Sequence, residues 1–135
     1  MEDITTKIYD AIINNEEIMK HVPKNNIKFF DYPNAQEIKD IVIVIDPLDT
    51  PKPDDFADND NLTYEYLYQI DVRGPNYDVV KLLQEEIRQT LWSIGFKQVD
   101  GTDEYDTDLK LYMDARRYRG NPYTIDGLRH IDKHI

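Results

Sequence analysis

The sequence predicts an α+β fold, in which a mainly antiparallel sheet of about five strands carries two helices packed on one face. Apolar residues recur at helical spacing in two segments, one at the start of the chain and one between the third and fourth expected strands. In the longest strand segments an apolar residue occupies every second position. The connections between segments are short, which favours antiparallel neighbours. The expected order is α-β-β-β-α-β-β, within a single domain over residues 1–120.

The first helix is expected at the amino terminus, where Asp3 can act as its cap. Its apolar stripe continues roughly in phase to Val22, and Pro23 ends it. The stripe begins with four residues at helical spacing, which are Ile4, Ile8, Ala11 and Ile12.

Three strands are expected next. Residues 27–32 form the first, and the β-branched run at 40–46 suits a central strand. The longest candidate, 62–73, alternates strictly and therefore places Tyr64, Tyr66 and Tyr68 on one face.

A second helix follows the stop signal Gly74-Pro75, and Asn76 is its candidate cap. Gly95 is a natural end for this helix. Its buried stripe is predicted to contain Val80, Leu83, Ile87, Leu91 and Ile94.

The carboxyl-terminal third predicts a short strand at 96–99, an acidic turn at 100–108 and a last alternating strand from Leu109 to Arg116. Residues 121–135 contain turn residues and little periodicity. They are expected to form an arm that becomes ordered against a partner.

The segment at 46–61 is expected to be an exposed acidic loop. It contains six Asp against one Lys, together with three prolines. Such charges are not buried in a core, and prolines cannot donate to a ladder. A long acidic loop on a small domain is expected to bind a partner, through Asp54, Asp55, Asp58 and Asp60.

The tyrosine face of the long strand has two interpretations. Alternating tyrosines can stack the bases of a single-stranded nucleic acid. They can also pack against a helix or a second subunit, which the flanking acids favour, so Tyr64, Tyr66 and Tyr68 are candidate subunit-interface residues. With both helices on one face, the other face would expose apolar side chains, which soluble monomers avoid and which an oligomer would bury.

The charge balance opposes general affinity for nucleic acid, because the net charge is −11. The distribution is uneven: residues 100–108 contain five acids and no base, and residues 116–135 contain five Lys or Arg against two Asp. This pattern is either a solvated surface or a polarised molecule that docks head to tail. In the second case Arg116, Arg117 and Arg119 are candidate partner-binding residues.

The chain lacks the recognisable motifs of an enzyme or of a cofactor site. It has no cysteine, and its one serine, Ser93, has no nucleophile-elbow context. His130 and His134 are spaced for a shared metal but lack further ligands, and the loop acids do not match a calcium loop. We therefore expect no catalytic residue, metal or cofactor. The absence of a long apolar run or a signal-like start favours a soluble protein made inside the cell, without a membrane partner.

The chain resembles the small tail-terminator, or head–tail joining, proteins of long-tailed bacteriophages of low-GC Gram-positive hosts. The resemblance lies in the order of EDITTKIYDAIINNEEI, IKFFDYP, DIVIVIDP, the acidic loop, LTYEYLYQIDVRG and YDVVKLLQEEIRQTLWSIGF. It covers most of the chain up to about Tyr118, and it transfers no individual functional residue.

This resemblance implies a virion protein made in the host cytoplasm that forms a hexameric ring at the head–tail junction. The ring would stop growth of the tail tube, bind the tail-tube protein and the head connector, and let DNA pass without specific binding. Alternatives are another neck component, such as a head-completion or stopper protein, an acidic DNA mimic that inhibits a nucleic-acid enzyme, and an unrecognised enzyme.

Overall fold

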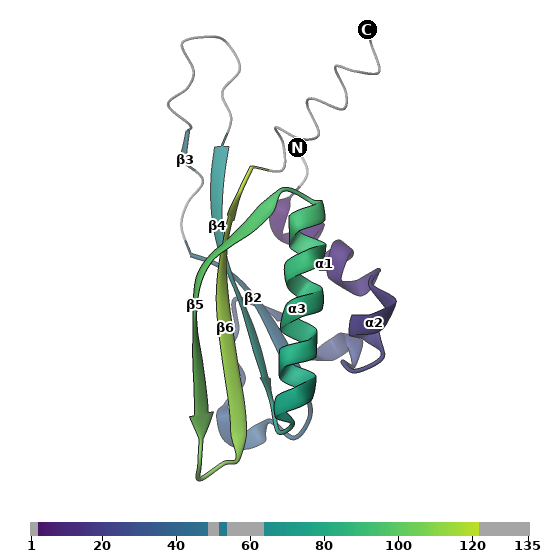
Figure 1. Cartoon of the computed structure of the whole chain (residues 1–135), viewed down its shortest axis with the longest axis vertical. Helices are drawn as coiled ribbons and strands as arrows, with labels where there is room; N and C mark the ends of the chain where they lie inside the picture. Colours follow the sequence, from purple (N-terminus) through teal and green to yellow (C-terminus); the bar gives the residue numbers. More distant parts are fainter. Residues whose placement is uncertain (1–2, 49–51, 54–63, 122–135) are drawn as a thin grey trace, which may run out of the picture.

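The computed structural model describes residues 3–48, 52–53 and 64–121, and it has the predicted α+β architecture (Figure 1). The helices are α1 (Ile4–Ile13), α2 (Glu16–Met19) and α3 (Tyr77–Ser93), with short 3-10 turns η1 (Lys24–Asn26) and η2 (Ala35–Glu37). The strands are β1 (Ile27–Phe29), β2 (Val42–Pro47), β3 (Lys52–Pro53), β4 (Tyr64–Gly74), β5 (Phe96–Asp106) and β6 (Leu111–Gly120).

The main sheet has the strand order β1-β2-β4-β6-β5, and β3 pairs with β4 beyond the end of β2. The pairs β2–β4, β3–β4, β4–β6 and β5–β6 are antiparallel, as predicted. The pair β1–β2 is parallel. The sheet is therefore mainly antiparallel, as predicted. The one parallel pair is possible because residues 30–41 form a crossover that brings the chain back to the end of the sheet where β1 began.

The amino-terminal helix begins as predicted but is divided into two. Asp3 accepts a hydrogen bond from the Thr5 amide at 3.1 Å, and α1 ends at Ile13. Asn15 then caps α2 by accepting from the Ile18 amide at 3.1 Å. The asparagine side chain competes with the helical backbone, which explains why the helix restarts there.

The helix α3 agrees with its predicted cap and stripe. Asn76 accepts a hydrogen bond from the Val79 amide at 3.2 Å, and Gly95 follows the helix with a φ of 96°, which favours glycine. Four of the five predicted stripe residues are buried and Ile94 is half-buried; the buried ones are Val80, Leu83, Ile87 and Leu91.

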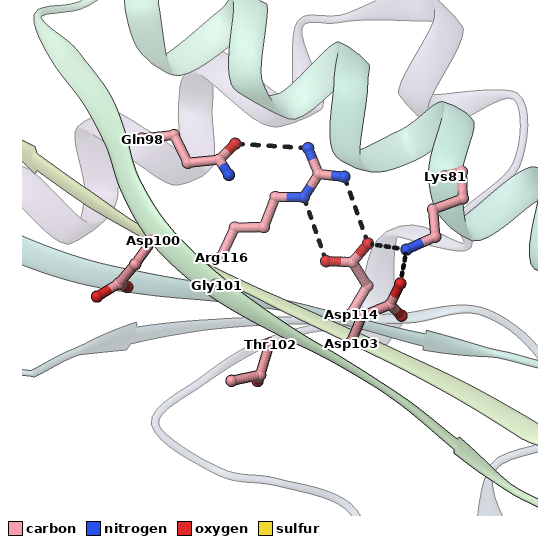
Figure 2. Close-up of a pocket in the computed structure, with 8 residues that line it drawn as sticks. All are labelled: Lys81, Gln98, Asp100, Gly101, Thr102, Asp103, Asp114 and Arg116. Carbon is pink, nitrogen blue, oxygen red and sulfur yellow. Dashed lines mark hydrogen bonds and ion pairs between the residues drawn. The ribbon is translucent and has the colours of Figure 1, made fainter.

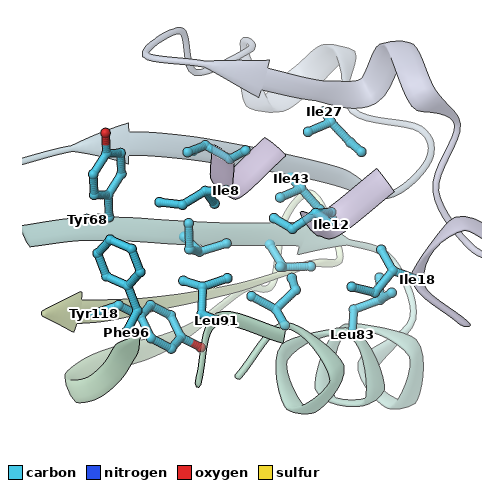
Figure 3. Close-up of a cluster of buried hydrophobic side chains, with 14 of the residues drawn as sticks. Ile8, Ile12, Ile18, Ile27, Ile43, Tyr68, Leu83, Leu91, Phe96 and Tyr118 are labelled. Carbon is cyan, nitrogen blue, oxygen red and sulfur yellow. The ribbon is translucent and has the colours of Figure 1, made fainter. Parts of the chain in front are cut away.

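The hydrophobic core lies between the three helices and one face of the sheet (Figure 3). Tyr66 and Tyr68 belong to this core; Tyr68 shares a buried hydrogen bond of 2.6 Å with Thr5 and packs edge-on against Phe96. Both rings thus pack against the helices of their own chain, as one of the two packing alternatives predicted. The proposal that they form a subunit interface is wrong, because neither has surface left to share; the side chain of Tyr64 lies outside the described residues.

The opposite face of the sheet combines polar residues in the middle of β4 with buried apolar residues on β2, namely Val42 and Val44. On β4, the residues that alternate with the core tyrosines include Gln69, Asp71 and Arg73. Arg117 on β6 donates to Gln69 at 3.4 Å, so the polar surface continues across strands. The described part of this face is therefore not the continuous exposed apolar surface that was predicted.

The predicted acidic turn is mostly strand. β5 continues to Asp106, and only residues 107–110 reverse the chain. Asp106 stabilises that turn by accepting from the amides of Asp108 and Leu109, both at 3.0 Å. The charged residues are compatible with a strand because β5 is an edge strand whose side chains are mostly exposed.

Candidate functional site

A surface groove lies between α3 and the edge strand β5. Two pockets of about 330 Å³ and about 360 Å³ lie along it, and both are lined by Gln98. Four residues of α3 line the groove or border its lower end, namely Tyr77, Lys81, Arg88 and Trp92. Their 4, 7 and 4 residue spacing places them on one side of the helix. We call this feature the α3–β5 groove.

The middle of the α3–β5 groove holds a buried carboxylate between two cations (Figure 2). Asp114 is only 2% exposed. Its carboxylate lies 2.7 Å from Lys81 Nζ and 3.2 Å from Arg116 Nε. Lys81 also pairs with Asp103 of β5, and Arg116 donates to Gln98 at 3.4 Å. Two cations and two carboxylates therefore balance, and the network joins α3 to β5 and β6.

This network is suited to structure and binding. Burial alone would lower the pKa of Lys81, but hydrogen bonds and the charges of Asp103 and Asp114 outweigh burial and raise it above its ordinary value. A lysine that stays protonated at neutral pH does not act as a nucleophile or general base. The lysine instead links its helix to the sheet through charge-assisted hydrogen bonds.

Both ends of the α3–β5 groove are aromatic. At one end, the Tyr77 and Tyr112 rings are 5.3 Å apart and the Tyr105 and Tyr112 rings are 4.3 Å apart. At the other end, Trp92 is 66% exposed and lines a pocket with Phe96. Exposed Tyr, Trp and Arg side chains are the residues that most often carry binding energy at protein interfaces.

Sequence reasoning did not find this groove. It placed Asp103 in an acidic turn, so this residue was not expected to lie beside Lys81 of the helix. The signal was present in the second stripe of α3, where Tyr77, Lys81, Arg88 and Trp92 follow helical spacing beside the apolar stripe. Which strand that stripe faces depends on tertiary pairing.

The three candidate partner-binding arginines lie on two faces of the sheet. Arg116 points toward α3 and forms an ion pair with Asp114. Arg117 and Arg119 lie on the opposite face, because they alternate with the buried Tyr118. The three candidates therefore do not share one surface, and their role as partner-binding residues stays a prediction.

Arg117 and Arg119 each have an acidic neighbour on an adjacent strand. Arg117 lies 3.6 Å from Asp100, and Arg119 lies 2.6 Å from Glu65. Both arginines remain about half exposed, so they are available to a partner only in competition with these pairs. The candidate acids Asp54, Asp55, Asp58 and Asp60 lie outside the described residues.

A second polar cluster lies on the face of the sheet that is opposite the helices. Asp71 is 4% exposed and accepts from Arg73 Nε at 2.8 Å. The Arg73 guanidinium stacks 5.0 Å from the ring centre of Tyr32, whose hydroxyl donates to Asp46 at 2.7 Å. Tyr32 thereby connects residues 30–41 to this face. Burial raises the pKa of Asp71, and Arg73 opposes that rise only in part.

The raised pKa of Asp71 predicts a pH dependence of stability. Above the ordinary pKa of an aspartate, the folded protein holds a proton that the unfolded chain has lost, so the free energy of unfolding falls as pH rises through this window. In D71N that decline should disappear. Urea unfolding between about pH 4 and pH 7 tests this, with the exposed D31N as the control. Parallel pH profiles for wild type and D71N would contradict it.

Among the described residues, no group of three or more His, Asp or Glu side chains is placed to hold a metal ion. The candidate pair His130 and His134 lies outside those residues. No helix within the described ranges is long and apolar enough to cross a membrane.

Comparisons with known proteins show structural similarity but no sequence match. No protein-family model matches the chain, and no curated protein matches it by sequence. Among solved structures, one that matches is a chain from the virion of a native gene transfer agent particle, with a TM-score of 0.57 and 7% identity. The match covers 84% of this chain and 90% of that chain. At this identity the likeness shows a shared fold.

Proposed function

We propose that this protein is a structural component of a phage-like virion, and that it forms a ring that ends the tail tube and joins it to the head connector. The observation that carries the proposal is the fold shared with a chain of a gene transfer agent virion over 90% of that chain's length. The order of elements along the chain, which resembles that of tail-terminator proteins, supports the same class independently.

The structure of the surface is compatible with assembly. The α3–β5 groove offers exposed aromatic residues beside a strand edge, and these are features that bind other protein surfaces. Its polar network is internally neutralised and contains no activated nucleophile, which favours a role in binding over catalysis. Heterologous contacts between identical copies close into a ring, for which we propose six subunits.

Net charge supports passage of DNA through such a ring. At −11, the chain repels phosphate instead of binding it. DNA would therefore cross the ring without adhering to it.

Another neck component, such as a stopper protein, is the alternative to a tail terminator, and the binding partner distinguishes these two roles. Binding to the tube protein supports a terminator, and binding to the portal or adaptor supports a stopper.

The proposal is tested by measuring the mass of the purified full chain in solution and imaging it by negative-stain microscopy, alone and with tail tubes. We expect closed rings, either free or at one end of each tube. A chain that remains a single subunit at high concentration and leaves tube ends bare would refute the proposal.

The acidic loop is predicted to bind one partner of this ring. The variant D54N/D55N/D58N/D60N should keep its unfolding midpoint and bind the tube or connector at least about tenfold more weakly, because rim charges steer docking. The control neutralises four exposed acids elsewhere, at Asp10, Glu16, Asp31 and Glu37. Equal affinity for the two variants would remove the loop from the binding surface.

A further inference from the structure

The two edges of the main sheet carry opposite charge. Within the edge strand β5 and the turn that follows it, residues 98–108 contain five acids and no base, and one lysine flanks them on each side, Lys97 and Lys110. The other edge strand, β1, lies in residues 18–30, which contain Lys20, Lys24, Lys28 and His21 and no acid. In Figure 1, β5 runs along the left border and α2, which leads into β1, lies on the right. The molecule is therefore polarised across its sheet.

The acidic edge is open. Within the described ranges β5 pairs only with β6, and residues 99–105 are exposed. An unpaired edge of this length can bind another chain. Pairing of one β5 with another β5 would place acids against acids, which is unfavourable. A segment with positive charge would complement this edge.

The basic edge of the same chain has unused charges. Lys20 pairs with Glu17 at 3.0 Å, but no ion pair within the described part of the chain involves Lys24 or Lys28. On the acidic edge, Asp100 is paired with Arg117 and Asp103 with Lys81, whereas Glu104 has no ion-pair partner among the described residues. The charges left over on the two edges are thus complementary in sign.

We propose that copies of this chain associate head to tail, with the β5 edge of one copy against the η1–β1 segment of the next. This inference rests on the proposed ring and names its interface. β1 and β2 run parallel, and each of the next three pairs reverses direction, so β5 and β1 run in opposite directions. Neighbouring copies in the same orientation would therefore meet with antiparallel edges. Such an interface uses two different surfaces of each copy, as ring closure requires.

Charge reversal on each edge tests the inference. The variant E104K places positive charge against Lys24 and Lys28, and the variant K24E/K28E places negative charge against Glu104. Each should weaken self-association at least about tenfold at low salt. A 1:1 mixture of the two should assemble as wild type does, because an alternating ring restores every contact. The controls are E37K and K39E, which reverse exposed charges on neither edge.

Sedimentation velocity and crosslinking of the full chain give the readout. Loss in each variant and recovery in the mixture would support the inference. Wild-type rings that tolerate both variants would overturn the interface and leave the proposed function standing. A mixture that stays dissociated would also overturn it. Wild-type protein that never self-associates, even with tail tubes, would overturn the proposed function and the interface together.

Discussion

Removing both cations beside Asp114 is expected to be the most damaging change to this fold. The double variant K81M/R116M should lose about 4 kcal/mol of unfolding free energy, because it leaves a buried charge without a partner. Asp114 is 2% exposed, and its two cations are Lys81 at 2.7 Å and Arg116 at 3.2 Å. Methionine keeps most of the apolar stem of both side chains, so the loss reports mainly the charge.

The single variants separate the two contributions. K81M and R116M should each cost about 1 kcal/mol, because the remaining cation still pairs with the carboxylate. The double variant should therefore cost more than their sum. Adding D114L should then recover a large part of the loss, since the isolated carboxylate is gone. Urea unfolding measures all four proteins, and R88M, which breaks the exposed Arg88–Glu85 pair, is the control that should leave the midpoint unchanged.

Additive losses in this set, or no recovery with D114L, would contradict the interpretation of Asp114 as a buried charge held by two cations.

The variant K81M also tests whether the α3–β5 groove supports the proposed contact between copies. Lys81 connects α3 to both β5 and β6, so K81M should loosen the edge that we propose to bind the next copy. Self-association should weaken in K81M at temperatures where the protein remains folded.

Features that depend on neighbouring residues were predictable from the sequence. The helix α3 follows from the cap at Asn76, the apolar stripe and the stop at Gly95, all of which act within one segment. The alternation of β4 likewise needs only the period of a strand. These local patterns were enough to predict the α+β class and the position of the longest helix and strand.

Features that depend on distant partners were not predictable. Tertiary packing decides which face of β4 meets the helices. For this reason Tyr66 and Tyr68 lie in the core and not at a subunit interface. Asp114 lies 33 residues from Lys81, and nothing near it in the chain indicates a buried network. The acidic run at 100–108 resembles a turn by composition, and it is a strand only because β6 pairs with it.

Close backbone packing at the end of the sheet gives the second large prediction. Gly120 pairs with Tyr66 on β4 and with Phe96 on β5, so three strands converge there. A Cβ at this position would lie 2.8 Å from the Phe96 Cα and still closer to the Gly95 carbonyl oxygen. Both are backbone atoms, which cannot move without separating β5 from β6. G120A should therefore cost about 3 kcal/mol.

Gly74, at the other end of β4, supplies the matched control. A Cβ there would also meet a neighbour too closely, but the atoms concerned belong to the flexible side chain of Ile41. That side chain can adopt another rotamer, so G74A should cost about 1 kcal/mol. Equal losses in urea unfolding would mean that the Gly95–Phe96 backbone shifts as easily as a side chain. The expected difference would show that the start of β5, which carries the Phe96 end of the α3–β5 groove, is held in place by main-chain contact.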